Sequence, residues 1–188
     1  MADIPPGPII VMGVAGCGKS TIGQLLADRL GLPYAEADSF HPPANVEKMS
    51  GGVPLTDQDR QPWLEAIAER IRQGDNPVVS CSALKRSHRN ILRQGDPGAW
   101  FLHLTLDRPT ARSRIAGRAA HFMPASLADS QFDALEPLCD ETGLTVDATR
   151  PPQEIVAAAV AALAATTSTN VTATHDLAAP GREETGRS

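Results

Sequence analysis

The sequence predicts a single three-layer α/β domain with a parallel sheet flanked by helices. Short apolar segments alternate along the chain with segments whose apolar residues repeat at helical spacing. Strands that alternate with helices pair in parallel through right-handed crossovers, so helices are expected on both faces of the sheet. A chain of 188 residues, 41% of them hydrophobic, is also long enough to bury one substantial core. A glycine-rich loop between the first strand and the first helix supports the same arrangement.

Five apolar segments are expected to form the buried strands. The first is flanked by prolines and glycines, which end regular structure on both sides. The fourth, which begins at Trp100, is the longest, and the second, which begins at Tyr34, is the weakest. Strands are predicted at residues 9–12, 34–37, 78–81, 100–106 and 144–147, which makes a five-stranded sheet.

Helical patterns lie between these strands and after the last one. The second pattern places Trp63, Leu64 and Ile67 on one stripe, as a helix packed on a sheet requires. The last is rich in alanine and follows two prolines, which favour a helix start. Helices are predicted at residues 22–30, 61–72, 86–93, 109–116 and 153–165. Because no apolar period follows, we expect one domain over residues 1–165 and a disordered tail over residues 166–188.

Composition argues against several classes of protein. The net charge of −5 disfavours nucleic-acid binding, which normally needs a basic surface. No apolar run is long enough for a membrane span, and the first residues lack the basic and apolar parts of a signal peptide. The three cysteines have no metal-binding spacing and fit a reducing compartment. We therefore expect a cytoplasmic protein that binds neither nucleic acid nor membrane.

Lysine is scarce in this chain. Of the 17 basic residues, only Lys19, Lys48 and Lys85 are lysines. Lysine is a compact point charge on a flexible stem, whereas arginine offers a planar fork, and a site that reaches phosphate can demand the former. Lys48 and Lys85 are therefore candidate site residues, with plain surface charge as the open alternative.

The segment GVAGCGKST matches the phosphate-binding loop G-x-x-x-x-G-K-[ST] at every required position. Its glycines let backbone N–H groups turn toward a phosphate chain, and the start of the following helix adds positive partial charge. Lys19 is expected to reach the terminal phosphates of a nucleotide, and Ser20 to ligate Mg²⁺. The predicted nucleotide-binding residues here are Gly13, Val14, Ala15, Gly16, Cys17, Gly18, Lys19, Ser20 and Thr21.

A phosphate-binding loop alone leaves kinases, GTPase switches and motor ATPases open. The chain has no Asn-Lys-x-Asp guanine-binding motif, and the strand that ends at Asp107 continues with Arg108, which matches the second ATPase motif only in part. Glu36 and Asp38 follow the second strand and, being two residues apart, point the same way. One carboxylate is suited to hold a Mg²⁺-bound water and the other to accept a hydrogen bond from a substrate hydroxyl. A solvated loop after the strand is the alternative.

Three segments further along the chain resemble the gluconokinase family. The first, DSFHPPANVEKMSGGVPLTDQDRQPWL at residues 38–64, is similar to the family's substrate segment. The second is CSALK at residues 81–85, with Arg89 after it. The third has HFM at residues 121–123 and SQFDALEP at residues 130–137, which resemble the family's lid. The resemblance implies a P-loop kinase fold with a lid, similar to shikimate and nucleoside monophosphate kinases, and ATP-dependent phosphorylation of D-gluconate at its 6-hydroxyl.

The resemblance also implies roles for individual residues. Asp38 matches the carboxylate that faces the attacking hydroxyl, and Glu36 stands where most relatives have Asp. Arg60 is the best candidate for a bidentate clamp on the substrate carboxylate. For His41 and Asn45, a role in structuring the loop is the alternative. The implied substrate-binding residues are Asp38, His41, Asn45, Lys48, Arg60, Lys85 and Arg89, and the implied metal site is Ser20 with Glu36.

Arginines in the lid region are expected to lie over the nucleotide. By resemblance, Arg118 swings over the γ-phosphoryl group, neutralises transition-state charge and excludes water. Arg114 is expected to stack on adenine, and Arg150 to border it. The catalytic residues are then Lys19, Asp38 and Arg118, the cofactors are ATP and Mg²⁺, and relatives suggest a homodimer. A kinase of another sugar acid or polyol such as shikimate, or a nucleotide-gated binding module, stays open as an alternative.

Overall fold

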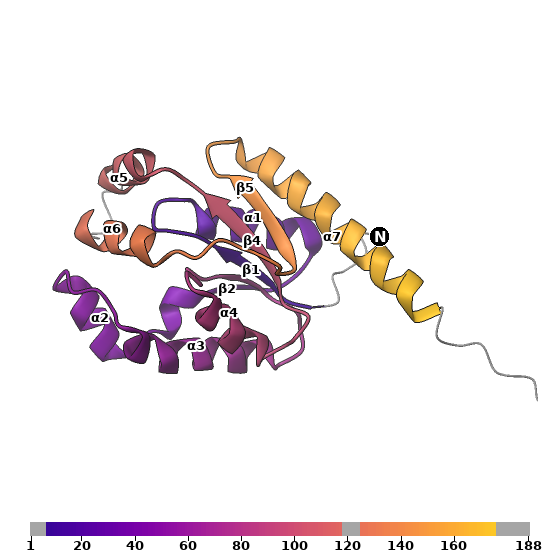
Figure 1. The fold of residues 1–188 in the computed structure, drawn as a ribbon, viewed down its shortest axis with the longest axis horizontal. Coiled ribbons are helices and arrows are strands. Elements are labelled where there is room, and N and C mark those ends of the chain that lie inside the picture. The colour runs from indigo at the N-terminus through magenta and orange to yellow at the C-terminus, as the bar shows by residue number, and fades with distance from the viewer. Residues whose placement is uncertain (1–6, 118–124, 176–188) are drawn as a thin grey trace, which may run out of the picture.

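The computed structural model describes residues 7–117 and 125–175, with side chains described for residues 7–117 and 128–166. Five parallel strands form one sheet in the order β2-β3-β1-β4-β5 (Figure 1). Their bounds are Ile9–Met12 for β1, Tyr34–Glu36 for β2, Val78–Ser80 for β3, Trp100–Thr105 for β4 and Gly143–Asp147 for β5. Ile9 pairs with Val78 on one side and Trp100 on the other, so β1 is the central strand. The predicted five-stranded parallel sheet is confirmed.

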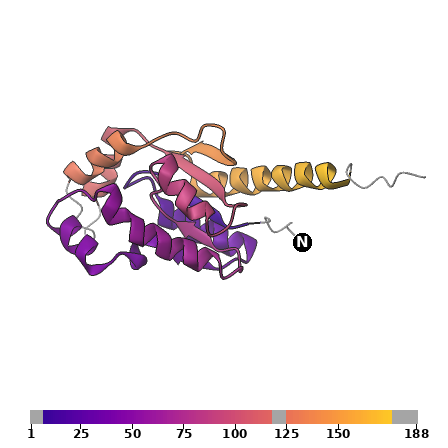
Figure 2. The same ribbon diagram turned by 60° about the horizontal axis from the view of Figure 1, so that its bottom comes forward.

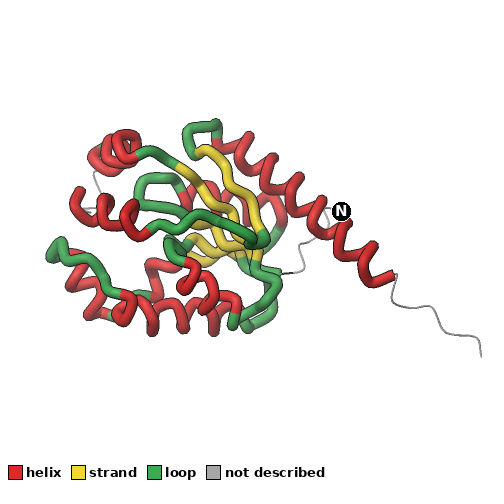
Figure 3. The backbone as a smooth tube through the Cα atoms, in the orientation of Figure 1, coloured by secondary structure: helices red, strands yellow, loops and turns green. Residues whose placement is uncertain are grey.

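Helices cover both faces of this sheet, as Figure 3 shows with the strands in yellow between helices in red. Ile9 and Val11 of β1 pack in a core with α1 and α7, whereas Ile10 and Met12 pack in a second core with α3 and α4. This division follows from the alternation of side chains along a strand. The helices are α1 Lys19–Leu30, α2 Pro43–Ser50, α3 Asp57–Ile71, α4 Arg86–Arg93, α5 Arg108–Ala116, α6 Ala125–Ala134 and α7 Pro152–His175.

Local capping explains where several helices begin. The Thr56 side chain accepts a hydrogen bond from the Asp59 amide, and Asp59 bonds back to Thr56, so α3 begins four residues earlier than the apolar stripe predicted. Asp107, at the end of the partial ATPase motif, accepts a hydrogen bond of 2.7 Å from the Thr110 amide and caps α5. Its carboxylate therefore has a structural role, which accounts for the incomplete motif.

Three helices were not predicted, and one is longer than expected. The missed helices are α2, α6 and a short 3₁₀ helix, Ala37–Phe40. The expectation of a disordered tail from residue 166 is wrong for residues 166–175, because α7 continues to His175. Residues 153–165 are rich in alanine, the best helix former, whereas residues 166–175 hold one alanine and five threonines, so helix propensity alone does not account for the extension. Residues 176–188 lie outside the described residues.

The loops that follow the strands meet at one end of the molecule. In Figures 1 and 2, α2, α5 and α6 gather at this end, and α7 extends in the opposite direction. Parallel strands send their carboxyl ends to the same edge, which is where ligands bind in open α/β sheets. The fold therefore places the phosphate loop, Glu36 and Asp38 on one side of the molecule.

Close packing between α1 and the sheet predicts the effect of a substitution at Gly23. A Cβ atom there would lie 2.5 Å from Ser80 Oγ and 2.8 Å from the Tyr34 ring. We expect Gly23→Ala to lower the free energy of unfolding by about 1–3 kcal/mol in urea titrations, despite the higher helix propensity of alanine. Gly51→Ala is the control, because its Cβ would meet nothing closer than 3.5 Å. A Gly23→Ala protein as stable as the parent would contradict this packing.

Candidate active site

The phosphate-binding loop joins the central strand directly to α1. Gly16 and Gly18 have φ values of 83° and 95°, a left-handed region that favours glycine, and they turn the loop around the start of the helix. Lys19 is the first residue of α1, and its Nζ donates to the Val14 carbonyl at 3.1 Å. The loop thus has the backbone form that a phosphate chain requires.

A cavity of about 400 Å³ opens in front of this loop, within the usual range for small-molecule sites. The loop lines it with Ala15, Gly16, Gly18, Lys19 and Ser20, whereas Val14 and Cys17 are buried in the core. Other elements contribute Glu36, Asp38, His41, Val46, Met49, Ser50, Pro54, Leu55, Arg60, Trp63, Ser82, Ile115, Ser130 and Gln131. Nine of the predicted donor and acceptor residues therefore face one space: the five loop residues with Glu36, Asp38, His41 and Arg60.

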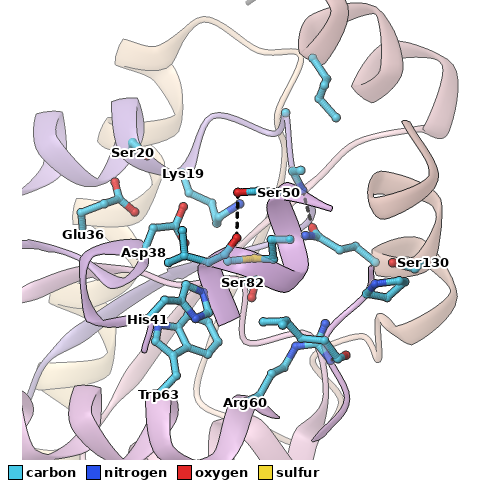
Figure 4. A pocket seen from close by; sticks show the side chains of 18 of the residues that line it. Lys19, Ser20, Glu36, Asp38, His41, Ser50, Arg60, Trp63, Ser82 and Ser130 are labelled. Carbon is cyan, nitrogen blue, oxygen red and sulfur yellow. Dashed lines mark hydrogen bonds between the residues drawn. The ribbon is translucent and has the colours of Figure 1, made fainter. Parts of the chain in front are cut away.

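Two carboxylates approach the loop from the end of β2. Figure 4 shows Ser20 and Glu36 at one side of the cavity and Asp38 between them and His41. The Tyr34 hydroxyl donates to Glu36 Oε2 at 2.6 Å, and burial raises the pKa of Tyr34 to about 12, so this hydroxyl stays protonated at neutral pH. Glu36 and Asp38 thus lie in different surroundings, as two distinct roles require.

An aromatic stack forms the next part of the wall. The rings of His41 and Trp63 lie 4.2 Å apart with an interplanar angle of 13°. Trp63 Nε1 donates to the Ala37 carbonyl at 2.7 Å, which ties α3 to the segment that carries Asp38. Burial lowers the pKa of His41, Arg60 lowers it further, and Asp38 acts in the opposite direction. His41 is therefore a neutral hydrogen-bonding group at neutral pH.

Arg60 carries positive charge to the far end of the cavity. Its side chain is 13% exposed, and its Nη1 donates to the Leu55 carbonyl at 2.6 Å. Arg60 also lines a second cavity of about 340 Å³ with Asp57, Lys85 and Ser130. The closest carboxylate oxygen of Asp57 is 3.9 Å from Arg60 Nη1, so this ion pair is loose. The guanidinium can accordingly turn donors toward an anionic ligand.

Comparisons with known proteins agree with this geometry. A family model described as shikimate kinase matches residues 15–164. The chain is 44% identical to a gluconokinase of Gluconobacter oxydans over 158 residues, which is 81% of this chain and 89% of that protein. It is 44% identical to the thermosensitive gluconokinase of Escherichia coli over 70% of this chain and 73% of that protein. A solved gluconokinase from Sinorhizobium meliloti is 45% identical, covers 90% of this chain and 98% of its own, and superimposes with a TM-score of 0.84.

The chain belongs to the gluconokinase family. Its fold is the P-loop kinase fold, with the five-stranded parallel sheet that the sequence predicts. Within the described residues, no helix is both long and apolar enough to cross a membrane.

Asn45 and the two predicted lysines are related to the cavities in different ways. Asn45 is 4% exposed and donates to the Asp59 carbonyl at 2.8 Å. Its side-chain nitrogen lies 3.4 Å from His41 Nδ1, so Asn45 positions the histidine that stacks on Trp63. Lys48 pairs with Asp59 at 2.6 Å and is not among the described residues that line either cavity. Lys85 lines the second cavity and pairs with Asp57 at 2.6 Å. Of the two, only Lys85 is placed to meet a substrate.

Arg89 is a correction to the predicted site. Its side chain is 1% exposed and pairs with the buried Glu141 at 2.6 Å. Further guanidinium bonds go to the carbonyls of Ala83 and Glu136, both at 3.1 Å. A guanidinium enclosed by protein acceptors has no donor to offer a substrate, so Arg89 holds the segment after α6 against α4. Its position after CSALK indicated proximity to the cavity, but only the tertiary contacts show its burial.

The lid helices reach the phosphate loop. Gln131 on α6 accepts a hydrogen bond of 2.7 Å from the Ala15 amide, and Arg112 on α5 pairs with Asp129 on α6 at 2.6 Å. Arg114 donates to the Ala148 carbonyl at 3.0 Å, beside the loop that the prediction placed around adenine. Arg150 pairs with Glu154 at 3.1 Å. Arg118 lies outside the described residues.

Some cavity residues were not predicted as functional. Trp63 was assigned to the core stripe, and it does pack there, but its ring also faces the cavity. Gln131 lies in the lid segment that resembles the family, so that resemblance was the available signal. Cys81 was expected to be core, and this is confirmed, since burial raises the pKa of its thiol to about 12.

The oxygen groups around the loop fit Mg²⁺. The hydroxyl of Ser20 and the carboxylate of Glu36 are hard ligands of the kind this ion prefers. Groups of three or more potential metal-binding side chains are absent from the described residues. A magnesium ion that binds together with a nucleotide does not need such a group of side chains, because phosphates and waters supply most of its ligands.

The buried position of Arg89 predicts a loss of stability rather than of binding. Burial would raise the pKa of Glu141, but Arg89 and Arg93 outweigh it and hold that pKa below its usual value. Arg89→Met would leave Glu141 buried beside Arg93 alone, and we expect a loss of about 3–5 kcal/mol of unfolding free energy. Because the folded-state pKa is lowered, the stabilisation is present above the ordinary pKa of glutamate and disappears as the pH falls through the folded value.

Urea titrations at pH 7 and at lower pH measure this effect. Arg93→Met is the matched control, since Arg93 is 23% exposed, and its loss should be smaller. If the Arg89→Met protein is stable but its KM for a sugar acid rises more than about tenfold, Arg89 binds the substrate after all.

Proposed function

We propose that this protein transfers the γ-phosphoryl group of ATP to the 6-hydroxyl group of D-gluconate. One observation carries the proposal: Lys19 and Asp38 line the same cavity, whose far end holds Arg60. A phosphate donor and a polyhydroxylated acid can then meet in one space. The names of the similar proteins, gluconokinases of Gluconobacter oxydans and Escherichia coli, support gluconate as the acceptor.

The phosphate loop forms the donor half of the proposed site. Backbone N–H groups where the loop enters α1 are proposed to bind the phosphates, and Lys19 to reach the transferring group from the start of α1. The amides of Gly13, Ala15 and Cys17 bond to acceptors within the protein in this structure. Ser20 is the proposed direct ligand of Mg²⁺, and Glu36 the proposed holder of a metal-bound water. Magnesium, when bound, would neutralise charge that develops during transfer.

Asp38 is the proposed catalytic group of the acceptor half. A carboxylate beside the reacting hydroxyl orients it and accepts its proton as the bond to phosphorus forms. His41, held by Trp63 and Asn45, is proposed to bond the substrate's other hydroxyls. The Asn45 amide nitrogen lies 3.4 Å from His41 Nδ1 and can donate to it, so Nε2 is left to carry the hydrogen of the neutral imidazole and to donate it to a substrate hydroxyl.

The substrate carboxylate is proposed to bind between Arg60 and Lys85. Both residues line the second cavity, which adjoins the first at Pro54, Leu55 and Arg60. Asp57 lies between the two cations and keeps Lys85 in place until an acid arrives. Lys48 is proposed to act indirectly, because it pairs with Asp59 and so fixes the start of α3.

Closure of the lid completes the proposed site. Arg118 is proposed to cover the transferring phosphoryl group, with Arg114 and Arg150 beside the adenine. The contact of Gln131 with the Ala15 amide supports an α6 that approaches the nucleotide. By family resemblance we further propose a homodimer in the cytoplasm, and the net charge of −5 supports a protein without a nucleic-acid partner.

Removal of the proposed general base tests the reaction. We expect Asp38→Asn to lower kcat by about 10²- to 10⁴-fold while the Kd for ATP stays unchanged. ADP release, coupled to a reporter and measured with gluconate, shikimate, other sugar acids and nucleoside monophosphates, gives both the activity and its specificity. Asp28→Asn, on the exposed part of α1, is the control. Nucleotide binding without phosphorylation of any acceptor would instead indicate a binding module.

Replacement of Arg60 tests the position of the carboxylate. Loss of a charge-assisted hydrogen bond costs about 1.5–3 kcal/mol, so Arg60→Met should raise the KM for gluconate about 10- to 100-fold. With glucitol, which has a hydroxymethyl group in place of the carboxylate, the same change should have little effect on KM. Arg70→Met is the control, since Arg70 pairs with Asp75 at the other end of α3. Equal losses with the acid and the polyol would contradict the proposed clamp.

A further inference from the structure

Tyr34 lies at the start of β2 and contacts Glu36, one of the two residues of the proposed metal site. Its hydroxyl is 2.6 Å from Glu36 Oε2, and Tyr34 and Glu36 are two residues apart on the strand, so both side chains extend from the same face. Ser20, the other residue of that site, lies at the same side of the cavity as Glu36 (Figure 4). The phenol therefore touches the carboxylate that is proposed to hold a Mg²⁺-bound water.

The position of this hydroxyl is fixed by packing. The Tyr34 ring lies against Gly23 of α1, where a Cβ atom would come within 2.8 Å of it. The hydroxyl also lies 2.9 Å from Ser80 Oγ, and the buried Ser80 donates to the Lys19 carbonyl at 2.9 Å. Tyr34 is thus joined to the first turn of α1, from which Lys19 and Ser20 extend.

The number of hydrogens available to these hydroxyl groups favours a hydrogen bond from Tyr34 to Glu36. A phenol has one hydrogen and can donate to one partner at a time. The carboxylate is the closer acceptor and the charged one, which makes it the stronger partner. The Ser80 hydroxyl donates its own hydrogen to the Lys19 carbonyl. Tyr34 uses one acceptor site of Oε2, so the Glu36 carboxylate can still accept a hydrogen bond from a metal-bound water.

We propose that Tyr34 is a positioning residue for the metal side of the donor site, because its hydroxyl holds the Glu36 carboxylate next to Ser20. A glutamate has three rotatable side-chain bonds, and an unrestrained carboxylate would lose that freedom each time the metal binds. Because the bond to Tyr34 already restricts the Glu36 side chain before the metal binds, less conformational entropy is lost on binding. The inference deepens the proposed function and rests on it.

The test is the dependence of nucleotide binding on magnesium. We measure by calorimetry the Kd of a nonhydrolysable ATP analogue with excess MgCl₂ and with EDTA, and divide the Kd in EDTA by the Kd in MgCl₂. We expect Tyr34→Phe, which keeps the ring packed on Gly23, to reduce this ratio about tenfold and to leave the Kd in EDTA unchanged. The Mg²⁺ concentration for half-maximal activity should rise in parallel, with the KM for gluconate unchanged.

Two further variants separate positioning from a structural role. Glu36→Gln should reduce the ratio by itself, and Tyr34→Phe should add little to it in a double-mutant cycle. Ser80→Ala is the matched control: it removes the bond to the Lys19 carbonyl and the 2.9 Å contact with the Tyr34 hydroxyl but keeps the bond between Tyr34 and Glu36, so the ratio should equal that of the parent.

Three outcomes would overturn the inference. A Tyr34→Phe protein with the parent's ratio shows that the hydroxyl does not serve the metal. Equal weakening in MgCl₂ and EDTA, shared by Ser80→Ala, shows that Tyr34 serves only the fold. A parent protein that binds the analogue equally well in both solutions and phosphorylates no acceptor removes the proposed function itself, which distinguishes that failure from the other two.

Discussion

The turn from β1 into α1 is the constraint on which the site depends. Because β1 is the central strand, the helix that follows it begins at the middle of the sheet edge. Gly16 and Gly18 allow the chain to make this turn with its amides facing outward, and Lys19 then begins the helix. The neighbouring strands run parallel to β1, so the segments after them arrive at the same edge. Asp38 and Ser82 therefore line the cavity opposite the loop.

The first turn of α3 organises the acceptor half in a similar way. Thr56 caps the helix, and the acids that follow lie near its positive end, where carboxylates are favourable. Asp57 and Asp59 hold Lys85 and Lys48, respectively. One turn of helix thus sets the charges around Arg60. A change in the cap would therefore disturb several of the proposed substrate contacts at once.

Burial and partners separate residues of one type into different roles. Arg60 and Arg89 both lie near the cavity, and both are largely buried. Arg89 is enclosed by Glu141 and backbone carbonyls, whereas Arg60 faces two cavities and has only a loose contact with Asp57. Glu36 and Asp38 both line the cavity, but Glu36 also accepts a hydrogen bond from Tyr34, which restricts its carboxylate. A polar side chain can bind a ligand only where some of its donors or acceptors are not already bonded within the protein.

The sequence by itself determined the strand and helix order, the phosphate loop and the family, because these depend on local patterns of apolar residues, glycines and short motifs. Even the bounds of β1 and α4 follow from such patterns. Only the tertiary structure decided the pairs that are remote in sequence: Arg89 with Glu141, 52 residues apart, and Gln131 with Ala15, 116 apart. A periodic pattern shows which face of an element is buried. It does not show which side chain of another element meets that face, because this depends on how the whole chain packs.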